Sequence, residues 1–563
     1  MRTYFKTVLT TLIAIVISTL PISTEVATNT ELTFSSFIGG DMVDWVLDIS
    51  SDDSGDIYLA GITSSRDFSI SDPDSCIGTP CRVAYLAKIN GATFALEYVT
   101  KFGGTSNEYL ISIALDDSGY IYLAGFTEST DFPTLNGLQM NYGGGATDGY
   151  LLKLAPDGTT IIWSSYFGGS AEDRIYGITV DPVTGILYLC GETKSSDFPL
   201  TTPFDSVFAG ESEAFVVSVS TDGTQVRYSS FFGGNGTDEA RSIVFKAGAG
   251  AVICGTTTSA DLETEFTFGA TDRSTADGIV ATISEADFAP VHTARIGGTG
   301  EDLFLSVAID SFGRICVGGS SDSDDMPTVN AFQSFHAGNG DAYLALISQE
   351  YDSLIYAGYF GGSEFENIYE LALDNDGYVY FTGAEHSPDI PLLYPYQGYK
   401  IGTSDAVAVK LNLFAPTLSY STYCGGWHYQ GSNTAHLRSN GLFCVGGTTK
   451  SFDYPQVDAF QPILAGGTFD GFISCFTAPT PGGEICCRTP GDSDHNGLVS
   501  IGDVTFVIAY VFSSGLSPVC SDEADANGSG AITIADVTYL ISRIFSGGAA
   551  PICGQNGIAY QME

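Results

Sequence analysis

With 563 residues, the chain is too long for one ordinary hydrophobic core, so we expect several domains or one array of repeats. Apolar residues make up 44% and aromatic residues 12% of the sequence, which excludes a disordered chain. Only 21 basic residues oppose 66 acidic ones, and the formal net charge of −45 argues against nucleic acid as a partner, because it repels phosphate backbones. Such an acidic surface suits Ca²⁺, a basic partner or simple solubility.

The amino terminus has the features of a secretory signal. Arg2 and Lys6 precede an apolar run over residues 8–17, and Pro21 follows it. About ten apolar residues are too few to span a bilayer, so we predict a signal peptide over residues 1–27, with its cleavage site left open. No later segment is apolar for long enough to cross a membrane. We therefore expect a secreted or cell-surface protein without a transmembrane segment after signal removal.

The 12 cysteines of an exported chain indicate an oxidising compartment. Cys76 and Cys81 lie in one loop and could close a local disulfide. Further connectivity cannot be deduced from the sequence. Four other cysteines lie in apolar segments expected in the core, where we predict free buried thiols: Cys190, Cys254, Cys316 and Cys444.

Gly-Gly pairs recur along most of the chain at intervals of 64 or 65 residues. Each pair follows a large or apolar residue, and the pairs start at Gly39, Gly103, Gly168, Gly233, Gly297, Gly361 and Gly425. A fixed period of this length is typical of a repeat architecture. Within one unit, turn signals separate four apolar segments, at residues 111–115, 120–125, 149–154 and 161–167. Four strands per unit, with glycine in the turns, predict one blade of a β-propeller.

The order of these strands predicts how the propeller closes. A strand of the outermost type precedes every Gly-Gly pair, including the first, but none follows the last unit. We therefore predict an all-β, seven-bladed propeller over residues 32–477, with four-stranded blades. Residues 33–38 should pair with residues 471–476 and close the ring, because closure removes the exposed sheet edges.

The repeated unit resembles a known family. Its motifs are Tyr-Phe-Gly-Gly at residues 166–169, Gly-Ile-Thr-Val-Asp at 177–181, Leu-Tyr-Leu-Cys-Gly-Glu-Thr at 187–193 and Asp-Gly-Tyr-Leu-Leu-Lys-Leu at 148–154. This unit is similar to the SBBP repeats of secreted bacterial β-propellers and, more distantly, to NHL-type repeats. The resemblance implies the fold and export. It implies no shared activity, so no catalytic residue is assigned.

Acidic residues recur at three positions of the unit, and the predicted strand directions place all three on one face of the ring. The first series ends at Gln430 instead of an acid: Asp44, Glu108, Asp173, Asp238, Asp302 and Glu366. The second is Asp67, Asp131, Asp197, Asp261, Asp325, Asp389 and Asp453, and the third is Asp148, Glu213, Asp277, Asp341, Asp405 and Asp470. In one interpretation, these acids accept hydrogen bonds from turn N–H groups. In the other, they form a rim that binds cations or a basic partner.

The seventh unit differs from the others. Residues 427–430 read Trp-His-Tyr-Gln, and His436 and Arg438 follow. Aromatic, imidazole and guanidinium groups on one face could recognise a sugar or a peptide; the alternative is loss of the repeat pattern at the closing blade. The six histidines occupy unrelated positions, and we find neither a repeated metal-ligand spacing nor a nucleophile elbow.

A linker over residues 478–490 leads to a second domain over residues 491–553, followed by a tail over 554–563. This domain contains two loops of the EF-hand type, each leading into an amphipathic helix predicted at 504–512 and 537–545. Oxygen ligands at loop positions 1, 3, 5, 7, 9 and 12 predict two Ca²⁺ sites, in which positions 7 offer backbone carbonyls. The predicted ligands are Asp492, Asp494, Asn496, Leu498, Ser500 and Asp503 in the first loop, and Asp525, Asn527, Ser529, Ala531, Thr533 and Asp536 in the second.

This doublet resembles a type I dockerin, a family in which Asp at position 12 is normal. The resemblance implies a cohesin-like partner, although positions 10 and 11 hold Ile501-Gly502 and Ile534-Ala535 where the family has Ser/Thr-type residues. We expect some of Cys486, Cys487, Cys520 and Cys553 to form disulfides around the domain. Together these features favour a non-enzymatic propeller scaffold or binding protein, attached through a calcium-binding dockerin-like module to a cohesin-like or cell-surface protein or to a glycan. The alternative is an extracellular glycoside hydrolase or lyase that acts on polysaccharide and is tethered by the same module.

Overall fold

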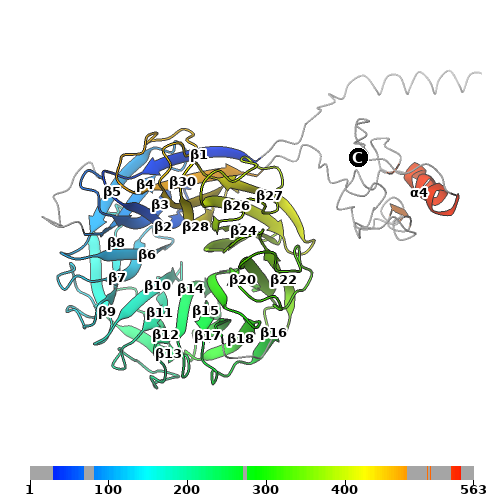
Figure 1. Ribbon diagram of the computed structural model, residues 1–563. Helices are drawn as coiled ribbons and strands as arrows, with labels where there is room; N and C mark the ends of the chain where they lie inside the picture. The colour runs from blue at the N-terminus through cyan, green and yellow to red at the C-terminus, as the bar shows by residue number, and fades with distance from the viewer. Residues whose placement is uncertain are drawn as a thin grey trace, which may run out of the picture. The chain divides into compact units, whose positions relative to one another are not determined.

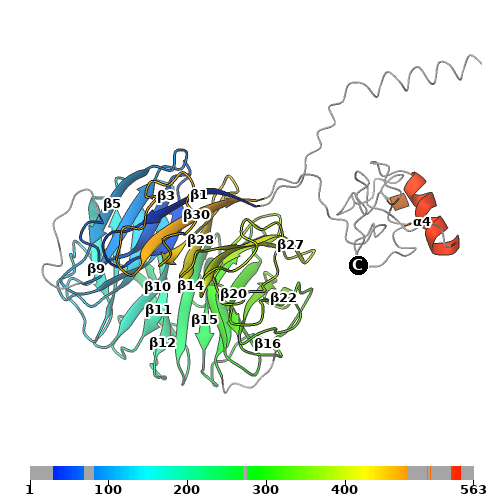
Figure 2. The same ribbon diagram turned by 45° about the horizontal axis from the view of Figure 1, so that its top comes forward.

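The computed structural model describes residues 30–68, 81–269 and 275–478 and, towards the carboxyl terminus, residues 504, 507, 508, 526 and 534–546. One compact unit comprises Thr30–Ala478. In it, seven small sheets surround a common axis (Figure 1), and the view in Figure 2 shows the same ring tilted. The predicted seven-bladed β-propeller is therefore confirmed.

Each blade contains four antiparallel strands, which are named in order from the axis outwards. Blade 1 is β2 (Asp44–Ser51), β3 (Ile57–Thr63), β4 (Val83–Ile89) and β5 (Leu96–Phe102). Blade 2 is β6 (Glu108–Leu115), β7 (Ile121–Thr127), β8 (Asp148–Leu154) and β9 (Ile161–Phe167). Blade 3 is β10 (Asp173–Val180), β11 (Leu187–Thr193), β12 (Glu213–Val219) and β13 (Val226–Phe232). Blade 4 is β14 (Asp238–Lys246), β15 (Gly250–Thr257), β17 (Asp277–Ser284) and β18 (Pro290–Gly297), with β16 (Phe266–Gly269) added in parallel outside β18.

The other three blades follow the same plan with two variations. Blade 5 is β19 (Asp302–Ile309), β20 (Ile315–Ser321), β21 (Asp341–Ile347) and β22 (Leu354–Phe360). In blade 6 the second strand is split: β23 (Glu370–Leu373), β24 (Tyr378–Thr382) with β25 (Ala384–Glu385), β26 (Asp405–Asn412) and β27 (Thr417–Cys424). Blade 7 is β28 (Gln430–Leu437), β29 (Phe443–Thr449), β30 (Asp470–Thr477) and β1 (Glu31–Ile38).

The two middle strands of a blade are buried on both faces, because neighbouring blades cover each sheet from both sides. Every residue of β3, β11, β12, β20 and β21 is buried. Such strands read as continuous apolar runs rather than alternating ones. The core consists of layers between adjacent blades, for example one in which Leu151 of blade 2 belongs to the same cluster as Ile178 and Phe215 of blade 3.

The closing strand lies where the sequence predicts it. β1 pairs antiparallel with β30, so that Phe37 lies opposite Phe472 and Ile38 lies opposite Gly471. The seventh sheet thus combines strands from both ends of the repeat region. Phe34 and Phe37 are fully buried in it.

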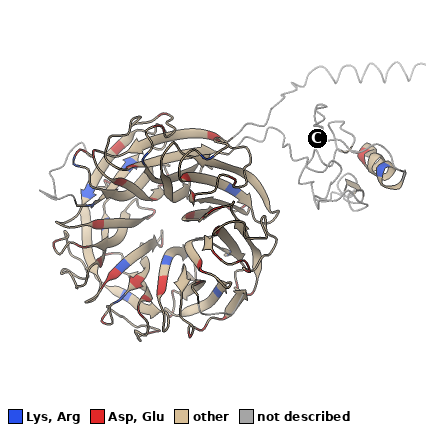
Figure 3. Cartoon of the chain, in the orientation of Figure 1, with Lys and Arg blue, Asp and Glu red and all other residues tan. Residues whose placement is uncertain are grey.

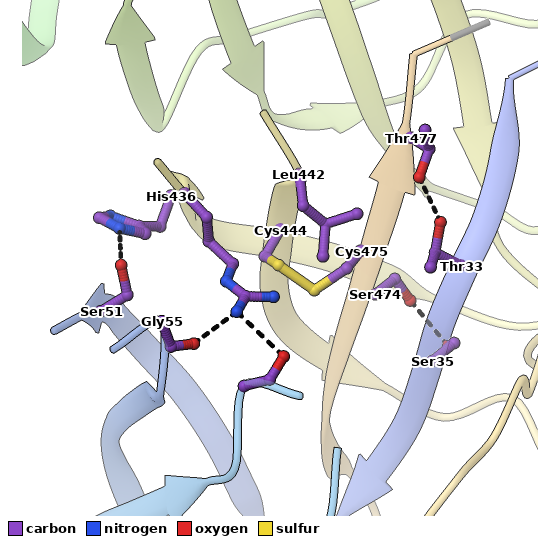
Figure 4. The surroundings of a disulfide bond; sticks show 12 residues. Thr33, Ser35, Ser51, Gly55, His436, Leu442, Cys444, Ser474, Cys475 and Thr477 are labelled. Atoms are coloured by element: carbon purple, nitrogen blue, oxygen red, sulfur yellow. Dashed lines mark hydrogen bonds between the residues drawn. A yellow bond between two sulfur atoms is a disulfide. The ribbon is translucent and has the colours of Figure 1, made fainter. Parts of the chain in front are cut away.

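The prediction of a free thiol at Cys444 was wrong. Cys444 on β29 lies directly opposite Cys475 on β30, and the two form a disulfide (Figure 4). The prediction was correct for the equivalent cysteines of blades 3 to 5, which are free and buried: Cys190, Cys254 and Cys316. Their cross-strand partners are Val216, Val280 and Leu346, which cannot form a disulfide. Cys81 is disulfide-bonded, and its predicted partner Cys76 lies outside the described residues.

The carboxyl-terminal module is described in part. Helix α4 (Ile534–Ser546) covers the second predicted helix and buries Val537 and Leu540 in a small cluster with Val504, Val507 and Ala526. Of the twelve predicted calcium ligands, only Asp536 is among the described residues; it lies in the first turn of α4 and is fully buried. The helices that the structure describes include none long and apolar enough to cross a bilayer.

Candidate functional site

The Gly-Gly pairs are explained by a hydrogen-bonded clamp at the start of each innermost strand. In blade 1, the N–H of Gly40 donates to Asp44 Oδ2 (2.8 Å), and the next N–H, of Asp41, donates to Asp67 Oδ1 (2.7 Å). The N–H of Met42 donates to Ser65 Oγ, whose hydroxyl donates to Asp44 (2.7 Å). A Cβ on Gly40 would lie 2.4 Å from Asp67 Oδ1, so only glycine fits there.

The clamp recurs in all seven blades, with Gln430 in place of the first acid in blade 7. It confirms that the first and second acidic series accept hydrogen bonds from turn N–H groups. Its serine was not predicted, although the spacing Thr-x-Ser-x-Asp in blades 1 to 4 and 7 could have revealed it. In each blade the serine oxygen accepts the second N–H after the Gly-Gly pair: Ser65, Ser129, Ser195, Ser259, Ser323, Ser387 and Ser451. A buried hydroxyl two residues earlier also approaches the first acid in most blades, as Thr257 donates to Asp238 Oδ1 (2.5 Å).

The same geometry brings two acids together where one blade meets the next. A Cβ added to Gly39 would lie 2.8 Å from Asp470 Cγ of blade 7 and 2.9 Å from Asp44 Oδ2 of blade 1. Both side chains are fully buried. Burial raises the pKa of Asp470 to about 7, and the nearby Asp44 carboxylate adds to this rise.

One junction holds its own counter-charge. Arg295, on β18 of blade 4, is fully buried; its Nε donates to Asp277 (2.5 Å) and its Nη1 to the carbonyl of Ser259 (2.8 Å). At the junction of blades 6 and 7, Gln430 replaces the first acid, and its Oε1 accepts the N–H of Gly426 (3.1 Å). The acid pairs are therefore compensated differently from one junction to the next.

A polar cavity of about 250 Å³ lies on the axis of the ring, where the innermost strands meet. Six of these strands carry a β-bulge at the level of the cavity, and the bulge residues line it. They are Leu47, Ile111, Tyr176, Arg241, Leu305 and Asn433, and Tyr369 of blade 6 completes the ring. Figure 3 shows that acidic and basic residues occur on these inner strands.

A second ring, one residue further along each innermost strand, links the blades. The N–H of Ile113 in blade 2 donates to Asp48 Oδ2 of blade 1 (2.8 Å), and the N–H of Leu371 in blade 6 donates to Ser306 Oγ of blade 5 (3.1 Å). The residues of this ring are Asp48, Ser112, Gly177, Ser242, Ser306, Glu370 and Thr434. Most carry a hydroxyl, and two are acids.

The two acids of the second ring, Asp48 and Glu370, have pKa values above those of ordinary carboxyl groups. Burial raises the pKa of Asp48 to about 6. Burial and the negative charge of Asp48 raise the pKa of Glu370 to about 8, so Glu370 holds its proton at neutral pH. Across the same cavity, Arg241 pairs with Glu239 and stacks at 4.4 Å over the ring of Tyr176. The cavity therefore offers hydroxyl, carboxyl, phenol and guanidinium groups to a small polar ligand.

The unusual residues of blade 7 lie at opposite ends of its innermost strand. Trp427 and His428 precede β28, with 73% of Trp427 exposed, and the His428 ring lies near the exposed ring of Phe452 (6.3 Å). At the other end, Arg438 is buried and donates to the carbonyls of Gly55 and Gly91 in blade 1. Of the two interpretations of these residues, a recognition cluster of aromatic, histidine and arginine side chains on one face is therefore wrong. Arg438 instead joins the first and last blades.

Comparison with known families agrees with this architecture. Residues 162–199 match the beta-propeller repeat called SBBP, and residues 490–545 match the dockerin type I domain. The chain carries an SBBP propeller repeat and a type I dockerin domain. Both predicted resemblances are confirmed. Type I dockerins are generally calcium-binding and imply cohesin-like partners, which is consistent with an extracellular or cell-surface location. The buried carboxylate of Asp536 at the start of α4 suits the closing position of a calcium loop.

The dockerin-bearing chain has no match among curated proteins. Solved structures that it resembles include a protein of unknown function from Bacteroides caccae (11% identity, 60% of this chain and 89% of that one, TM-score 0.32) and one from Dyadobacter fermentans (10%, 80% and 99%, 0.38). A quinohemoprotein alcohol dehydrogenase from Comamonas testosteroni is similar at 8% identity, over 80% and 76% of the chains, with a TM-score of 0.39. Likeness at this level carries no argument about function.

Proposed function

We propose that the protein is a secreted or cell-surface, non-enzymatic β-propeller scaffold that its dockerin module attaches to a larger assembly. The observation that carries this proposal is the dockerin match over residues 490–545, because such modules connect a chain to a partner protein. In the proposal, each of the two predicted loops binds one Ca²⁺, and the propeller presents a rigid surface to a further protein or glycan.

The surface of α4 supports a protein partner. Ile534, Ile541 and Phe545 are 53%, 41% and 67% exposed and lie at i, i+7 and i+11, on one side of the helix. Val537 and Leu540 occupy the buried side. Apolar side chains aligned on an exposed helix face are typical of an interaction site. Ile534 and Ala535 also stand at the two positions through which dockerins are expected to recognise a cohesin, so this contact would be more apolar in this chain.

The hydrogen bonds of Asp48 and Glu370, the two acids of the second ring, support a structural role for these residues. Asp48 accepts N–H groups of Ile49 and Ile113, and Glu370 accepts the hydroxyl of Ser306 (2.6 Å). The bonds with Ile113 and Ser306 join neighbouring blades, so the acids contribute to holding the ring together. A cavity of about 250 Å³ is also below the usual range of about 300–1,000 Å³ for ligand pockets, and a polysaccharide would have to be bound outside it.

Binding of the full mature chain to an immobilised type I cohesin domain tests attachment. We expect binding in Ca²⁺ that EDTA abolishes, and Phe545→Ser should weaken it at least tenfold. The exposed Val183→Ser in the propeller, 83% exposed, is the matched control and should leave binding unchanged. No binding in Ca²⁺ would contradict a cohesin partner.

A second candidate function is an extracellular enzyme acting on polysaccharide. It is favoured by one observation, the presence of Asp48, Glu370, Arg241 and two tyrosines around the axial cavity. Two carboxyl groups with different pKa values are what glycoside cleavage uses. A glycan array probed with the full chain, with released sugars measured, separates the candidates. Binding without cleavage supports the scaffold, and cleavage that Glu370→Gln abolishes would support the enzyme.

A further inference from the structure

Blade 6 contains a buried acid where the other six blades have a hydroxyl. The position two residues before the clamp serine holds Thr63, Thr127, Thr193, Thr257, Ser321 and Thr449 in those blades, and Glu385 in blade 6. Each of the six hydroxyl oxygens accepts the N–H of the clamp serine. In blade 6, the N–H of Ser387 donates to Glu366 instead (3.1 Å).

Glu385 is surrounded by other acids. It lies opposite Asp405 on β26, and Glu366 and Asp341 lie close enough for their charges to act on it. All four residues are fully buried. Glu366 and Asp341 themselves converge: a Cβ added to Gly361 would lie 2.6 Å from Glu366 Oε2 and 2.8 Å from Asp341 Oδ1.

The neighbouring acids have hydrogen-bond donors, whereas Glu385 has none. Asp405 accepts the N–H groups of Ile401 and Gly402 (2.9 Å each), and Gly362 donates to Glu366 (2.7 Å). Glu385 lies within the described residues, and neither of its carboxyl oxygens has a hydrogen-bond partner there. An ionised carboxylate buried without donors strongly destabilises the folded state, and such a group normally takes up a proton instead.

We propose that Glu385 is a neutral carboxylic acid in the folded propeller and that blade 6 is a pH-sensitive element, which loosens when this proton is lost. In blades 2 to 5 the hydroxyl donates to the first acid, whereas Glu385 reaches no partner, so the proton keeps this buried side chain free of an uncompensated charge. No metal ion or other co-reactant is involved, and the proton leaves to solvent as the pH rises.

The charged and titratable groups around Glu385 favour the neutral acid. Burial raises the pKa of Glu385 well above its ordinary value, and Glu366 and Asp341 raise it further. Tyr423 on β27 also lies nearby, and its hydroxyl donates to the carbonyl of Ser387 (2.7 Å). Burial also raises the pKa of Asp341 and of Asp405, and a basic group opposes the rise at each, His336 at Asp341 and Lys400 at Asp405.

The backbone of blade 6 is also the least regular of the ring, which suits a loosening element. Its innermost strand β23 has 4 residues, against 8 in β2, β6 and β19. Its second strand is interrupted at Gly383, immediately before β25, which has only 2 residues and ends at Glu385. Glu370 in β23 is a second acid at a position where four other blades have a hydroxyl. Short strands with few ladder bonds open more readily than long ones.

Infrared spectroscopy of the full chain tests the protonation directly. A protonated buried carboxyl has a C=O stretch distinct from that of a carboxylate. We expect this band at pH 7 to lose intensity in Glu385→Gln, while the contribution of Glu370 remains. The control is Asp389→Asn, which removes an exposed acid of the same blade and should leave the band unchanged. The same band in wild-type protein and Glu385→Gln would overturn the proposal.

Calorimetry in EDTA measures how the loss of this proton changes the thermal stability of the propeller. We expect the Tm of wild-type protein to fall between pH 6 and pH 9 by several degrees more than that of Glu385→Gln or Glu385→Thr, the latter restoring the residue of the other blades. An equal fall would overturn the proposal. A rise in the propeller Tm on adding CaCl₂ at pH 9 that Glu385→Gln abolishes would also overturn it, because the acids would then hold a cation.

Hydrogen exchange of wild-type protein keeps the test decisive if the variants do not fold. After correction for the intrinsic pH effect, amides of residues 378–412 should exchange at least several-fold faster at pH 9 than at pH 6. Residues 277–297 of blade 4, where Arg295 supplies the counter-charge, are the internal reference and should change less. Equal changes in both blades would contradict a local element in blade 6.

Discussion

The hydroxyl oxygens of Ser35 and Ser474, 439 residues apart in the sequence, lie 2.8 Å from each other inside blade 7. Close by, Thr33 and Thr477 approach through their hydroxyls (2.5 Å), and the disulfide of Cys444 and Cys475 lies on the next pair of strands (Figure 4). The ring is thus closed by side-chain bonds and by a strand ladder that joins its two ends. Its stability depends on a short segment at the start of the propeller.

Removing residues 30–38 should open the ring. Their loss exposes the edge of β30 and leaves the partners of the buried Phe34 and Phe37 uncovered, so we expect a lower Tm and faster proteolysis within blade 7. A synthetic peptide of residues 30–40 should restore both properties, whereas the same peptide with serine at positions 34 and 37 should not. A truncated protein as stable as the complete one would contradict closure by β1.

Gly40→Ala should destabilise the propeller by about 1–3 kcal/mol, the usual cost of overpacking. The new Cβ would lie 2.4 Å from Asp67 Oδ1 and 2.6 Å from Ser65 Cβ, and relieving the clash breaks the clamp. Gly398→Ala is the matched control, because its nearest atom is Pro395 Cγ at 3.7 Å. Urea unfolding measures both, and equal stability of the two variants would refute the packing argument.

Arg438→Met should cost about 1.5–3 kcal/mol, since hydrogen bonds to a charged group are lost and two carbonyls of blade 1 become unsatisfied. The exposed Arg66→Met removes the same charge and should be nearly neutral. Chemical unfolding again provides the comparison. If both variants behave alike, Arg438 does not hold blades 1 and 7 together.

Much of this fold was predictable, because the repeat period aligns equivalent positions without any structure. Counting strand types along the chain was enough to place β1 against β30. The disulfide was not predictable from Cys444 alone, because a cysteine in a strand can form one only if another cysteine lies opposite it on the neighbouring strand. At that place blade 7 has Cys475, while blade 3 has Val216.

The axial cavity could not be predicted for a different reason. A bulge in the innermost strands shifts the alternation of side chains by one residue, so that Arg241 and Tyr176 line the axis. The acid at Glu385 was within reach of the sequence, because the hydroxyl position repeats with the same period. The acidic series alone do not reveal it, since a hydroxyl replaced by an acid is visible only where the hydroxyl positions are aligned.

Propeller stability should decrease as the pH rises from about 4 to about 7. Burial raises the pKa of Asp148, Glu213 and Asp470 to about 7, whereas in the unfolded chain the values are about 3.9 to 4.3. Between these values the folded state holds protons that the unfolded state has lost, so raising the pH favours unfolding. Calorimetry of Asp470→Asn should show a shallower fall of Tm with pH.

The reverse substitution provides a control for these acid pairs. Gln430 holds the position of the first acid in blade 7 and is fully buried, as is Asp405 of blade 6. Gln430→Glu therefore restores at this junction the buried acid that the other six blades have. We expect its Tm to fall more steeply with pH than that of wild-type protein. A Tm that does not depend on pH between 4 and 7 in any of these proteins would contradict the shared origin in buried acid pairs.

Titration of the full mature chain with CaCl₂ should give about two equivalents of heat, one for each predicted loop. Asp492→Ala and Asp525→Ala remove the first ligand of each loop, and each should reduce the stoichiometry by about one. Asp389→Asn removes an exposed carboxylate of the propeller clamp and should leave the stoichiometry unchanged, because that carboxylate accepts the N–H of Ser363 (2.9 Å).

Binding of Ca²⁺ should also protect residues 534–546 from hydrogen exchange, since Asp536 at loop position 12 lies in the first turn of α4. Absence of heat would rule out both sites, and a stoichiometry unchanged by either alanine variant would place the bound Ca²⁺ elsewhere in the molecule.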